Sequence, residues 1–496
     1  MKRISINPVT RLEGHGNIEI FLDAEGNVAN TYFQVPELRG FERFCVGRPA
    51  EDMPVITNRI CGVCPEAHHM ASTKALDALF GVEPPPAAQK IRELLYMAFF
   101  VVDHATHFYA LGGPDFIVGP DAPPAERNIL GVMRKVGGDT ARAVIDCRAR
   151  NHEAIRMLGG RGINPCAGVP GGWSKAVSRQ ERTALAATAA ANVEFALFTL
   201  QVFDSVVLGN DAYRAMLHSE AFEQRTYYMG TVDQRNRLNV YDGVIRVVDP
   251  EGCEFARYRA AEYLEHVAEH VEPWTYLKFP FLKKVGWKGF AEGAGSGVYC
   301  ATPLARLNVA DGMATPRAQE QYERMFEAFG RKKAGGRYAP VHHRLATHWA
   351  RLIELLYAAE RMAELANDEE ITCPDVRRIP ERVTGEGIGS VEAPRGTLIH
   401  HYRTDERGVL TGVNLIVGTT NNHAPIAMSI GKAAREFIRA GRVVEEGMLN
   451  RIEMALRLYD PCLSCATHAL PGCMPLVVRI RDAAGAELRC IRRSEA

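Results

Sequence analysis

Two Cys-x-x-Cys motifs stand near opposite ends of this chain of 496 residues. Cys61 and Cys64 form the first motif, and Cys462 and Cys465 form the second. This spacing places two thiols on one small turn, where both can bind the same metal ion. We therefore expect the fold to bring the motifs together into a single four-thiolate metal site, which would tie the N-terminal part of the chain to its C-terminal part.

The spacing does not identify the metal. Four thiolates suit structural zinc or an iron–sulfur cluster, and spacing alone favours zinc, for which tetrahedral sulfur sites are common. Zinc ribbons, however, place their two pairs only ~15–20 residues apart, whereas nearly the whole chain separates these two. Both pairs also have titratable neighbours, which redox or acid–base chemistry needs and a structural zinc does not: Glu66, His68, His69, Asp460 and His468.

Several other polar residues allow both a structural and a functional interpretation. Glu13, taken alone, favours a turn or salt-bridge role over proton transfer. Asp103 lies in an apolar stretch, so its carboxylate needs a partner, either a structural arginine or a group at a site. His104 and His107 favour the role of core histidines over that of metal ligands. Arg395 lies between a proline and a glycine, which suits presenting a guanidinium to a site, although a surface turn has the same sequence.

The composition is that of an ordinary globular protein, with 47% apolar and 24% charged residues. A formal net charge of zero gives no argument for binding nucleic acid or a membrane surface. The N-terminus lacks the apolar stretch of a signal peptide, and residues 94–111 contain Asp103 and two histidines, which predicts a buried helix rather than a membrane span. Eight further cysteines are predicted to be small packing residues: Cys45, Cys147, Cys166, Cys253, Cys300, Cys373, Cys473 and Cys490.

The apolar periodicity predicts one compact α+β domain that is mainly helical, with small peripheral sheets. Hairpins are expected at 4–34 and 396–418, and a β-rich insertion at about 226–300. Ser178 and Glu181 predict a capping box at the start of a helix. Helices are expected at 66–80, 87–111, 125–158 (two helices separated near Gly137), from Ser178 to about 217, and at 317–330, 341–366, 421–440 and 445–457.

Together these segments resemble the large, catalytic subunit of nickel–iron hydrogenases over most of the chain, and the resemblance implies that subunit's fold. The start of the chain and the last motif are most similar to the cytoplasmic group, which includes NAD-reducing and methyl-viologen-reducing enzymes. The two cysteine motifs, taken with the residues that flank them, are the most specific evidence for this resemblance. The matching segments are RLEGH at 11–15, RGFE at 39–42, RICGVC with His68 at 59–68, DHATHFY at 103–109, VPGG at 169–172, PLARLN at 303–308, EAPRGTLIHHY at 392–402 and DPCLSCATH at 460–468.

The resemblance implies a nickel ion held by all four cysteines of the two motifs. Cys64 and Cys465 would also bridge to an iron that carries carbon monoxide and cyanide ligands. Dihydrogen would be split heterolytically, with Cys462 as the first proton acceptor and Glu13 as the next carrier. Arg395 would overhang the site, oriented by Asp103 and Asp460. His68 would hydrogen-bond a bridging thiolate, and Thr419 and the backbone near Pro394 would hold the cyanides.

A second metal site is implied by the same resemblance. Glu42, the Leu415 carbonyl and the His468 ring would bind magnesium, largely through water. Residues 469–496 would be a propeptide. A dedicated endopeptidase would remove it after His468, once nickel-insertion chaperones have delivered the metal. The mature chain, 1–468, would then be a single catalytic domain. An alternative for the tail taken alone is an ordinary C-terminal strand pair.

The expected function is reversible heterolytic cleavage of dihydrogen in the cytoplasm, with electrons passed to an iron–sulfur small subunit, then to further electron-transfer subunits. The chain shows no additional cysteine cluster for an electron relay, so a partner has to supply one. Three alternatives compete with this function. They are a hydrogen-sensing subunit, which in this family usually lacks a tail; a quinone-reductase-type subunit, whose relatives have lost the four cysteines; and a scaffold held together by zinc.

Overall fold

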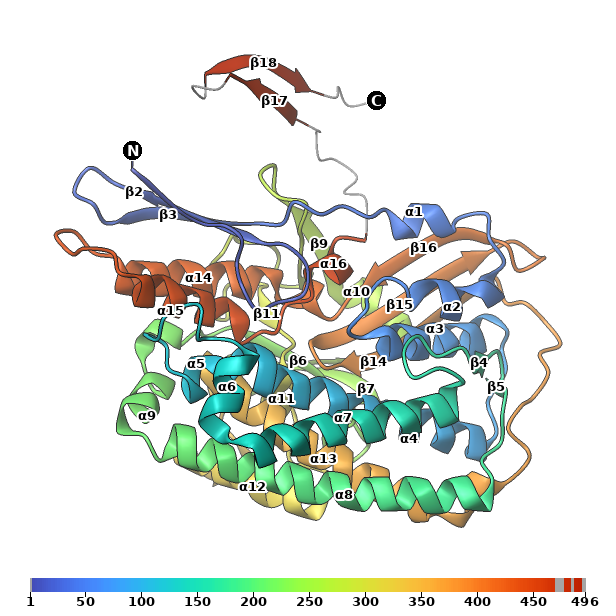
Figure 1. Ribbon diagram of the computed structural model, residues 1–496. Coiled ribbons are helices and arrows are strands. Elements are labelled where there is room, and N and C mark those ends of the chain that lie inside the picture. The colour runs from blue at the N-terminus through green and yellow to red at the C-terminus, as the bar shows by residue number, and fades with distance from the viewer. Residues whose placement is uncertain (1, 469–476, 483–485, 493–496) are drawn as a thin grey trace.

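The computed structural model describes residues 2–468, 477–482 and 486–492. Within these residues α-helices dominate, and the long helices α4, α7, α8 and α13 pack side by side as the main body of the molecule (Figure 1). The predicted mainly helical α+β class is confirmed. The α-helices are α1 (Phe41–Cys45), α2 (Met53–Thr57), α3 (Pro65–Leu79), α4 (Pro86–Thr106), α5 (Pro114–Ile117), α6 (Ile129–Val136), α7 (Gly138–Gly159), α8 (Arg179–Phe203), α9 (Asp211–Leu217), α10 (Tyr263–His266), α11 (Pro303–Val309), α12 (Pro316–Ala328), α13 (Thr347–Asn367), α14 (His423–Phe437), α15 (Glu446–Arg457) and α16 (Leu463–Ala466).

Shorter helical turns extend or connect these helices. Two of them are π-helical, η2 (His107–Gly112) at the end of α4 and η3 (Asp204–Leu208) at the end of α8. The others are the 3-10 turns η1 (Ala50–Asp52), η4 (Glu220–Phe222), η5 (Ala260–Glu262), η6 (Arg344–Ala346), η7 (Glu369–Thr372) and η8 (Thr419–Asn422).

The strands form seven small sheets among the described residues. The two predicted hairpins are confirmed as β2–β3 and β15–β16, and each gains a third antiparallel strand, β1 and β14. The expected β-rich region holds the four-stranded sheet β11-β6-β7-β8 and the pair β9–β10. The strands are β1 (Arg3–Ile6), β2 (Asn17–Leu22), β3 (Val28–Gln34), β4 (Gly168–Val169), β5 (Gly172–Trp173), β6 (Tyr227–Val232), β7 (Val244–Val248), β8 (Glu254–Tyr258), β9 (Val267–Val271), β10 (Lys278–Leu282), β11 (Tyr299–Cys300), β12 (Lys333–Ala334), β13 (Arg337–Tyr338), β14 (Glu386–Ala393), β15 (Gly396–Thr404), β16 (Leu410–Ile416), β17 (Val477–Arg481) and β18 (Glu487–Arg492).

Local sequence explains several helix boundaries. The capping box at the start of α8 is present, because the Ser178 hydroxyl accepts from the Glu181 N–H while the Glu181 carboxylate accepts from the Ser178 N–H. Gly137, at φ +86°, separates α6 from α7 as predicted. Helix α13 begins at Thr347 rather than at residue 341, because the preceding residues are extended and then form η6.

Two cysteine predictions are wrong. Cys166 and Cys253 are exposed rather than packed in the core. Cys166 follows a loop rich in glycine and proline, and Cys253 lies in the turn between β7 and β8, and such connections run over the surface. Cys45, Cys147 and Cys300 are buried as predicted.

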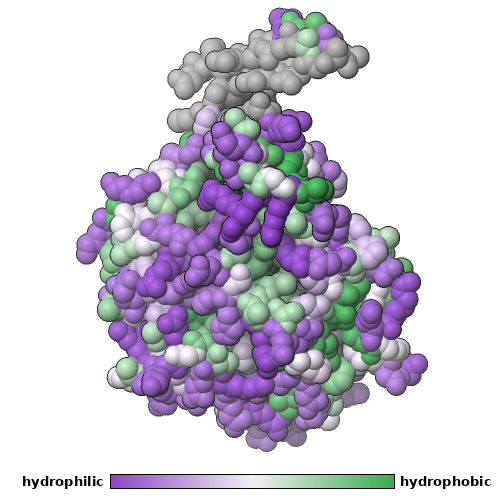
Figure 2. Space-filling view, turned by 90° about the vertical axis from the view of Figure 1, so that its left-hand side faces the viewer, coloured by the Kyte–Doolittle hydropathy of each residue, from purple (hydrophilic) through white to green (hydrophobic). Residues whose placement is uncertain are grey.

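The two longest apolar helices differ in burial. In the segment Pro86–Gly112, which is long and apolar enough to cross a membrane, 83% of the apolar window is buried inside the protein. Arg179–Leu208 meets the same criteria of length and composition, and 39% of its window is buried. Hydrophilic side chains cover most of the face in Figure 2, with hydrophobic residues only in scattered groups, as expected when apolar residues fill the interior.

Close packing of β14 on α3 brings together the elements that form the site. Gly387 and Gly389 of β14 face this helix, and a Cβ at Gly389 would lie 2.3 Å from the backbone nitrogen of Ala75. Only glycine allows this approach. The tight contact places the turn between β14 and β15, which carries Arg395, beside the N-terminal end of α3, which carries the first cysteine motif.

Candidate metal centre

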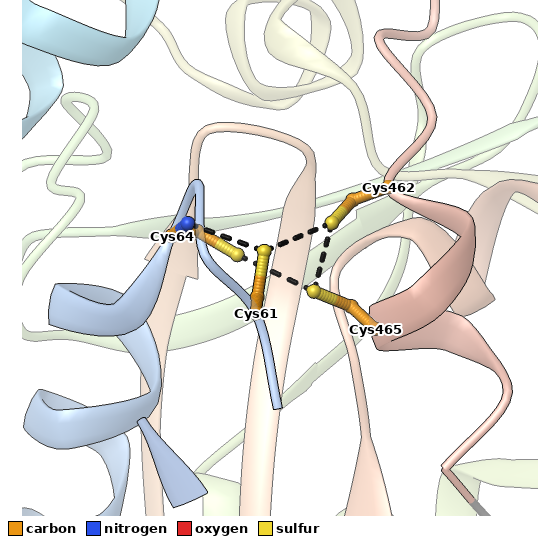
Figure 3. Close-up of side chains that lie close together, drawn as sticks. All are labelled: Cys61, Cys64, Cys462 and Cys465. Carbon is orange, nitrogen blue, oxygen red and sulfur yellow. Dashed lines mark hydrogen bonds between the residues drawn. The ribbon is translucent and has the colours of Figure 1, made fainter. Parts of the chain in front are cut away.

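The four motif cysteines meet in the interior, as predicted. Figure 3 shows Cys61 and Cys64 from the N-terminal segment and Cys462 and Cys465 from the C-terminal segment with their sulfurs turned toward one another. The Sγ atoms of Cys61 and Cys462 are 3.1 Å apart, and all four sulfurs lie within 4.8 Å of one another. All four residues are buried. Four converging thiols form a site for a metal that prefers sulfur ligands.

Local structure fixes each pair of thiols. Cys64 is the N-cap of α3, whose first turn begins with Pro65, and the Val63 and Cys64 amides donate to the Cys61 sulfur. Cys462 is the N-cap of the short helix α16, which carries Cys465 one turn later. Each motif therefore forms a compact turn with both sulfurs on the same side.

Arg39 joins the two motifs and was not assigned a role from the sequence. Its guanidinium donates to the carbonyls of Ile60 and Ser464, one next to each cysteine pair. Its backbone N–H also donates to the Thr467 carbonyl at 2.9 Å. One side chain therefore fixes the distance between segments far apart in sequence.

Burial and the contacts among the thiols shift their pKa values in different directions. Burial raises the pKa of Cys462 and Cys465, and the neighbouring thiols raise that of Cys462 further, so both lie well above the ordinary value. Burial also acts on Cys61, but hydrogen bonds from the other thiols and the charge of Arg395 outweigh it and lower its pKa well below the usual range. Binding a metal to all four sulfurs would therefore release protons.

Glu13 lies against the second cysteine pair. Its carboxylate Oε2 is 2.9 Å from the Cys462 sulfur and accepts a hydrogen bond from the Ser464 amide at 3.1 Å. The Leu463 amide donates to the Glu13 carbonyl at 2.9 Å, so the backbone also holds this residue in place. The structure thus places the Glu13 carboxylate as the hydrogen-bond acceptor of one thiol, whereas the sequence taken alone favoured a turn or salt-bridge role.

Arg395 forms two buried ion pairs beside the thiols. Its guanidinium lies 2.9 Å from Asp103 and 3.0 Å from Asp460. Asp460 also contacts Arg351 at 3.3 Å and His107 at 3.1 Å. Arg351 was not singled out in the sequence, because nothing local on α13 distinguishes it from a surface arginine.

The pKa values of the two carboxylates of this cluster are shifted in opposite directions. Burial raises the pKa of Asp103 to about 6, although Arg395 opposes the shift. Burial acts on Asp460 as well, but Arg395, His107 and Arg351 outweigh it and hold its pKa well below the usual range. Asp460 is therefore the fixed negative charge of the cluster.

His68 is buried at the end of a chain of polar side chains. Its Nδ1 lies 3.1 Å from Nε2 of His400, whose Nδ1 contacts the Tyr402 hydroxyl at 2.6 Å. Burial lowers the pKa of His68 to about 4, so the ring is neutral. Nε2 of His68 has no hydrogen-bond partner within the described part of the chain, which leaves it free for another group.

Thr419 and Pro394 lie next to the site, Thr419 against Cys462 and Pro394 directly before Arg395. The Thr419 hydroxyl oxygen accepts from the Cys462 amide at 3.0 Å, which leaves its own hydrogen available to a further acceptor. The Pro394 carbonyl is 3.1 Å from Arg306, which also donates to the Ala393 carbonyl and pairs with Glu354 at 2.6 Å. Arg306 therefore holds the backbone that leads into Arg395.

Arg306 is fully buried, so its loss has a large predicted effect on stability. We expect Arg306→Met to lower the free energy of unfolding by ~3–5 kcal/mol, since it leaves the buried Glu354 carboxylate without its cation. Urea-induced unfolding measures this change. The exposed Arg439→Met serves as the control and should unfold as the wild type does. An unchanged midpoint for Arg306→Met would contradict this account of the ion pair.

The three predicted magnesium ligands also converge. Nε2 of His468 lies 2.8 Å from the Leu415 carbonyl and 3.6 Å from the Glu42 carboxylate, which accepts from the Leu415 amide at 2.7 Å. Burial lowers the pKa of His468, but the Glu42 carboxylate and the neighbouring carbonyls raise it above the ordinary value. This arrangement offers hard oxygen donors together with an imidazole.

A cavity of about 150 Å³ opens beside the first cysteine pair, lined in part by Val63, Glu66 and Asp103. Burial raises the pKa of Glu66 to about 8, and the Asp103 carboxylate adds to the shift. Glu66 is therefore a neutral carboxylic acid at neutral pH. It faces the cavity as a polar group among mainly apolar walls.

Comparison with known proteins identifies the family. Residues 39–128 and 290–468 match the family described as nickel-dependent hydrogenase, and residues 3–38 match one described as HoxL-like. The chain belongs to the nickel-dependent hydrogenases. It is the large subunit of such an oxidoreductase, whose reaction is the oxidation and production of dihydrogen. Membership implies nickel and iron as its metals, and the cysteine cluster provides ligands for them.

Relatives match this hydrogenase along its whole length. An iron-sulfur subunit of the F420-non-reducing hydrogenase from Archaeoglobus profundus is 49% identical over 99% of this chain and 100% of its own. The NAD-reducing hydrogenase HoxS subunit beta of Cupriavidus necator is 37% identical, covering 98% of each chain. Among solved structures, an NAD+-reducing nickel–iron hydrogenase in the H2-reduced state has a TM-score of 0.86 at 36% identity and covers 94% of this chain and 100% of its own.

Proposed function

We propose that Cys61, Cys64, Cys462 and Cys465 would hold nickel in this hydrogenase, and that Cys64 and Cys465 would also serve as ligands of the iron. When bound, the nickel–iron group supplies the heterolytic cleavage of dihydrogen. The observation that carries the proposal is the 2.9 Å contact between the Cys462 sulfur and the Glu13 carboxylate. This contact gives the proton a defined route, from the sulfur to Oε2 of Glu13, within hydrogen-bond reach.

Arg395 contributes a permanent positive charge beside the thiolates in this proposal. Asp103 and Asp460 anchor its two terminal nitrogens, so the guanidinium cannot turn away. His68 would donate from Nε2 to a bridging thiolate, and its unpartnered, buried Nε2 supports this. Such hydrogen bonds from neighbouring groups tune a metal's ligands.

The iron is proposed to carry carbon monoxide and cyanide ligands. The free hydrogen of the Thr419 hydroxyl supports a role as donor to one cyanide. Proline has no N–H, so a donor near Pro394 has to come from a neighbouring residue, while Arg306 fixes the Pro394 carbonyl. A second, magnesium site is proposed at Glu42, the Leu415 carbonyl and His468, which the short distances among these groups support.

We propose that residues 1–468 form the mature catalytic domain and that 469–496 are removed after His468. The match to the solved NAD+-reducing relative spans 94% of this chain and 100% of the relative's chain. Residues 1–468 also make up 94% of this chain of 496 residues. His468 is buried, and its backbone carbonyl faces the Glu42 amide at 3.5 Å, so the end of the mature chain would be enclosed at the proposed magnesium site.

Intact mass spectrometry of the purified active enzyme tests the processing. We expect the mass of a chain that ends at His468 in the active form, and the full-length mass when nickel is withheld during expression. The second sample is the control, because cleavage is proposed to follow nickel insertion. Active enzyme that still ends at Ala496 would refute the processing step.

Electrons have to leave a buried site through another protein chain. We propose that the partner is an iron–sulfur small subunit, which passes electrons to further electron-transfer subunits. We propose also that a maturation endopeptidase and nickel-insertion chaperones act on this chain, and that the complex works in the cytoplasm. The names of the relatives support the partner subunits, since these relatives are themselves subunits of hydrogenases. Hydrogen-dependent reduction of a viologen dye by the assembled complex tests the function. Sustained turnover supports the enzyme over a sensing subunit, and absence of turnover in a fully metallated complex would contradict the proposal.

A further inference from the structure

Glu37 connects the neighbourhood of Glu13 with the protein surface. Its side chain is 21% exposed, and its Oε1 lies 2.5 Å from Nδ1 of His15, whose side chain is 72% exposed. Glu37 lies between β3 and α1, and His15 lies in the loop before β2. The pair therefore has one polar end in solvent.

The other oxygen of Glu37 points inward. Oε2 of Glu37 is buried and has no hydrogen-bond partner in the described part of the chain. It lies 3.0 Å from the position that a Cβ at Gly14 would occupy, and the Ser464 amide lies 2.8 Å from that same position. The Ser464 amide is also the donor to Oε2 of Glu13. The two carboxylates thus lie around the same backbone amide.

Gly14 keeps this space open. Its φ of +85° is a conformation that side chains with a Cβ rarely adopt, and a Cβ there would press on both Glu37 and Ser464. A buried, unpartnered carboxylate oxygen is a site that ordered water satisfies, and water in this space beside the Ser464 amide would link Glu37 to the Glu13 carboxylate.

We propose that Glu37 and His15 carry protons between Glu13 and solvent. The inference rests on the proposed role of Glu13 and extends it to the surface. During dihydrogen oxidation, Glu13 gives its proton through water to Glu37 and returns to the carboxylate. Glu37 then gives a proton to His15, and the exposed ring releases it to bulk water. Dihydrogen production uses the same steps in reverse.

The test is isotope exchange between D2 gas and H2O by the assembled, metallated enzyme. We expect Glu37→Gln to slow the exchange ~10²-fold, the lower end of the range for removing a positioned acid–base group. The content of nickel and iron and the infrared spectrum of the metal site should remain those of the wild type. Glu25→Gln, an exposed carboxylate in the β2–β3 turn, is the matched control and should exchange at the wild-type rate.

Chemical rescue separates a relay from a structural role. We expect His15→Ala to exchange slowly in dilute buffer and to recover as imidazole is added, because the small base replaces the missing ring. Exchange at the wild-type rate in Glu37→Gln, or a defect in His15→Ala that imidazole does not relieve, would overturn the inference. Normal exchange in Glu37→Gln but not in Glu13→Gln would refute only the route through Glu37 and His15. Normal exchange in both variants would also refute the proposed role of Glu13.

Discussion

Replacing Cys462 with alanine is expected to abolish dihydrogen oxidation and to deprive the site of nickel. Cys462 lies 3.1 Å from the Cys61 sulfur and 2.8 Å from that of Cys465, so its loss leaves three thiols where a metal needs four. It also removes the proposed first proton acceptor. The loss of activity should exceed the ~10–100-fold that changes around a metal's ligands typically cause. Viologen reduction and metal analysis of the purified complex measure the two effects.

Cys147→Ala is the matched control for this variant. Cys147 is also buried, on α7, where its sulfur approaches Asn192 rather than a thiol of the site. The control should retain nickel, iron and most of its activity. If Cys462→Ala kept wild-type nickel content and turnover, the four-thiolate site would be wrong.

Replacing Glu13 with glutamine is expected to stop proton exchange while leaving the metals in place. Glutamine preserves the shape of the side chain and can still accept from the Ser464 amide, but it cannot take a proton from the Cys462 sulfur. Removing a positioned acid–base group costs ~10²–10⁴-fold. We therefore expect D2–H2O exchange and hydrogen-dependent dye reduction to fall by that factor, with unchanged nickel and iron content.

Glu19→Gln is a suitable comparison, because Glu19 lies nearby on β2 but contacts Ser5 and Arg3 instead of the thiols. It should behave as the wild type. Wild-type exchange by Glu13→Gln would show that Glu13 is not on the proton route. The contact between Cys462 and Glu13 would then no longer support the proposed mechanism. Loss of nickel from the same variant would instead assign Glu13 a structural role.

Local patterns in the sequence predicted the centre of the site. The spacing within each motif places its two thiols on one turn, where both can bind the same metal. The structure brings the two distant motifs together, with all four thiols buried. The hairpins and most helices also follow from periodicity and capping residues such as Ser178. The boundaries of α13 were less predictable, because the extended residues before it have helix-compatible side chains.

Residues whose role comes from long-range contacts could not be predicted in the same way. Arg39 donates to carbonyls on both motifs, but the sequence gives no sign of which distant backbone a guanidinium reaches. Arg351 and His400 contact the site through Asp460 and His68. Each of these contacts depends on how helices and hairpins pack. The position of Arg39 and His400 within segments that resemble the hydrogenase family was the only signal available.

The pairing of Glu37 with His15 shows the same limit. Both residues lie in short loops with charged neighbours, where a solvated surface role is the ordinary expectation. Only the fold reveals that one carboxylate oxygen of Glu37 is buried without a partner, within the described residues, beside the Ser464 amide that holds Glu13. The proposed proton transfer therefore depends on how these loops assemble rather than on either cysteine motif.

Metal analysis combined with infrared spectroscopy of the purified large subunit tests the central claim most directly. We expect nickel and iron in equal amounts, together with the stretching bands of iron-bound carbon monoxide and cyanide. Both should be lost in Cys462→Ala and retained in Cys147→Ala. Zinc alone in the four-cysteine site, without iron and without these bands, would contradict the account.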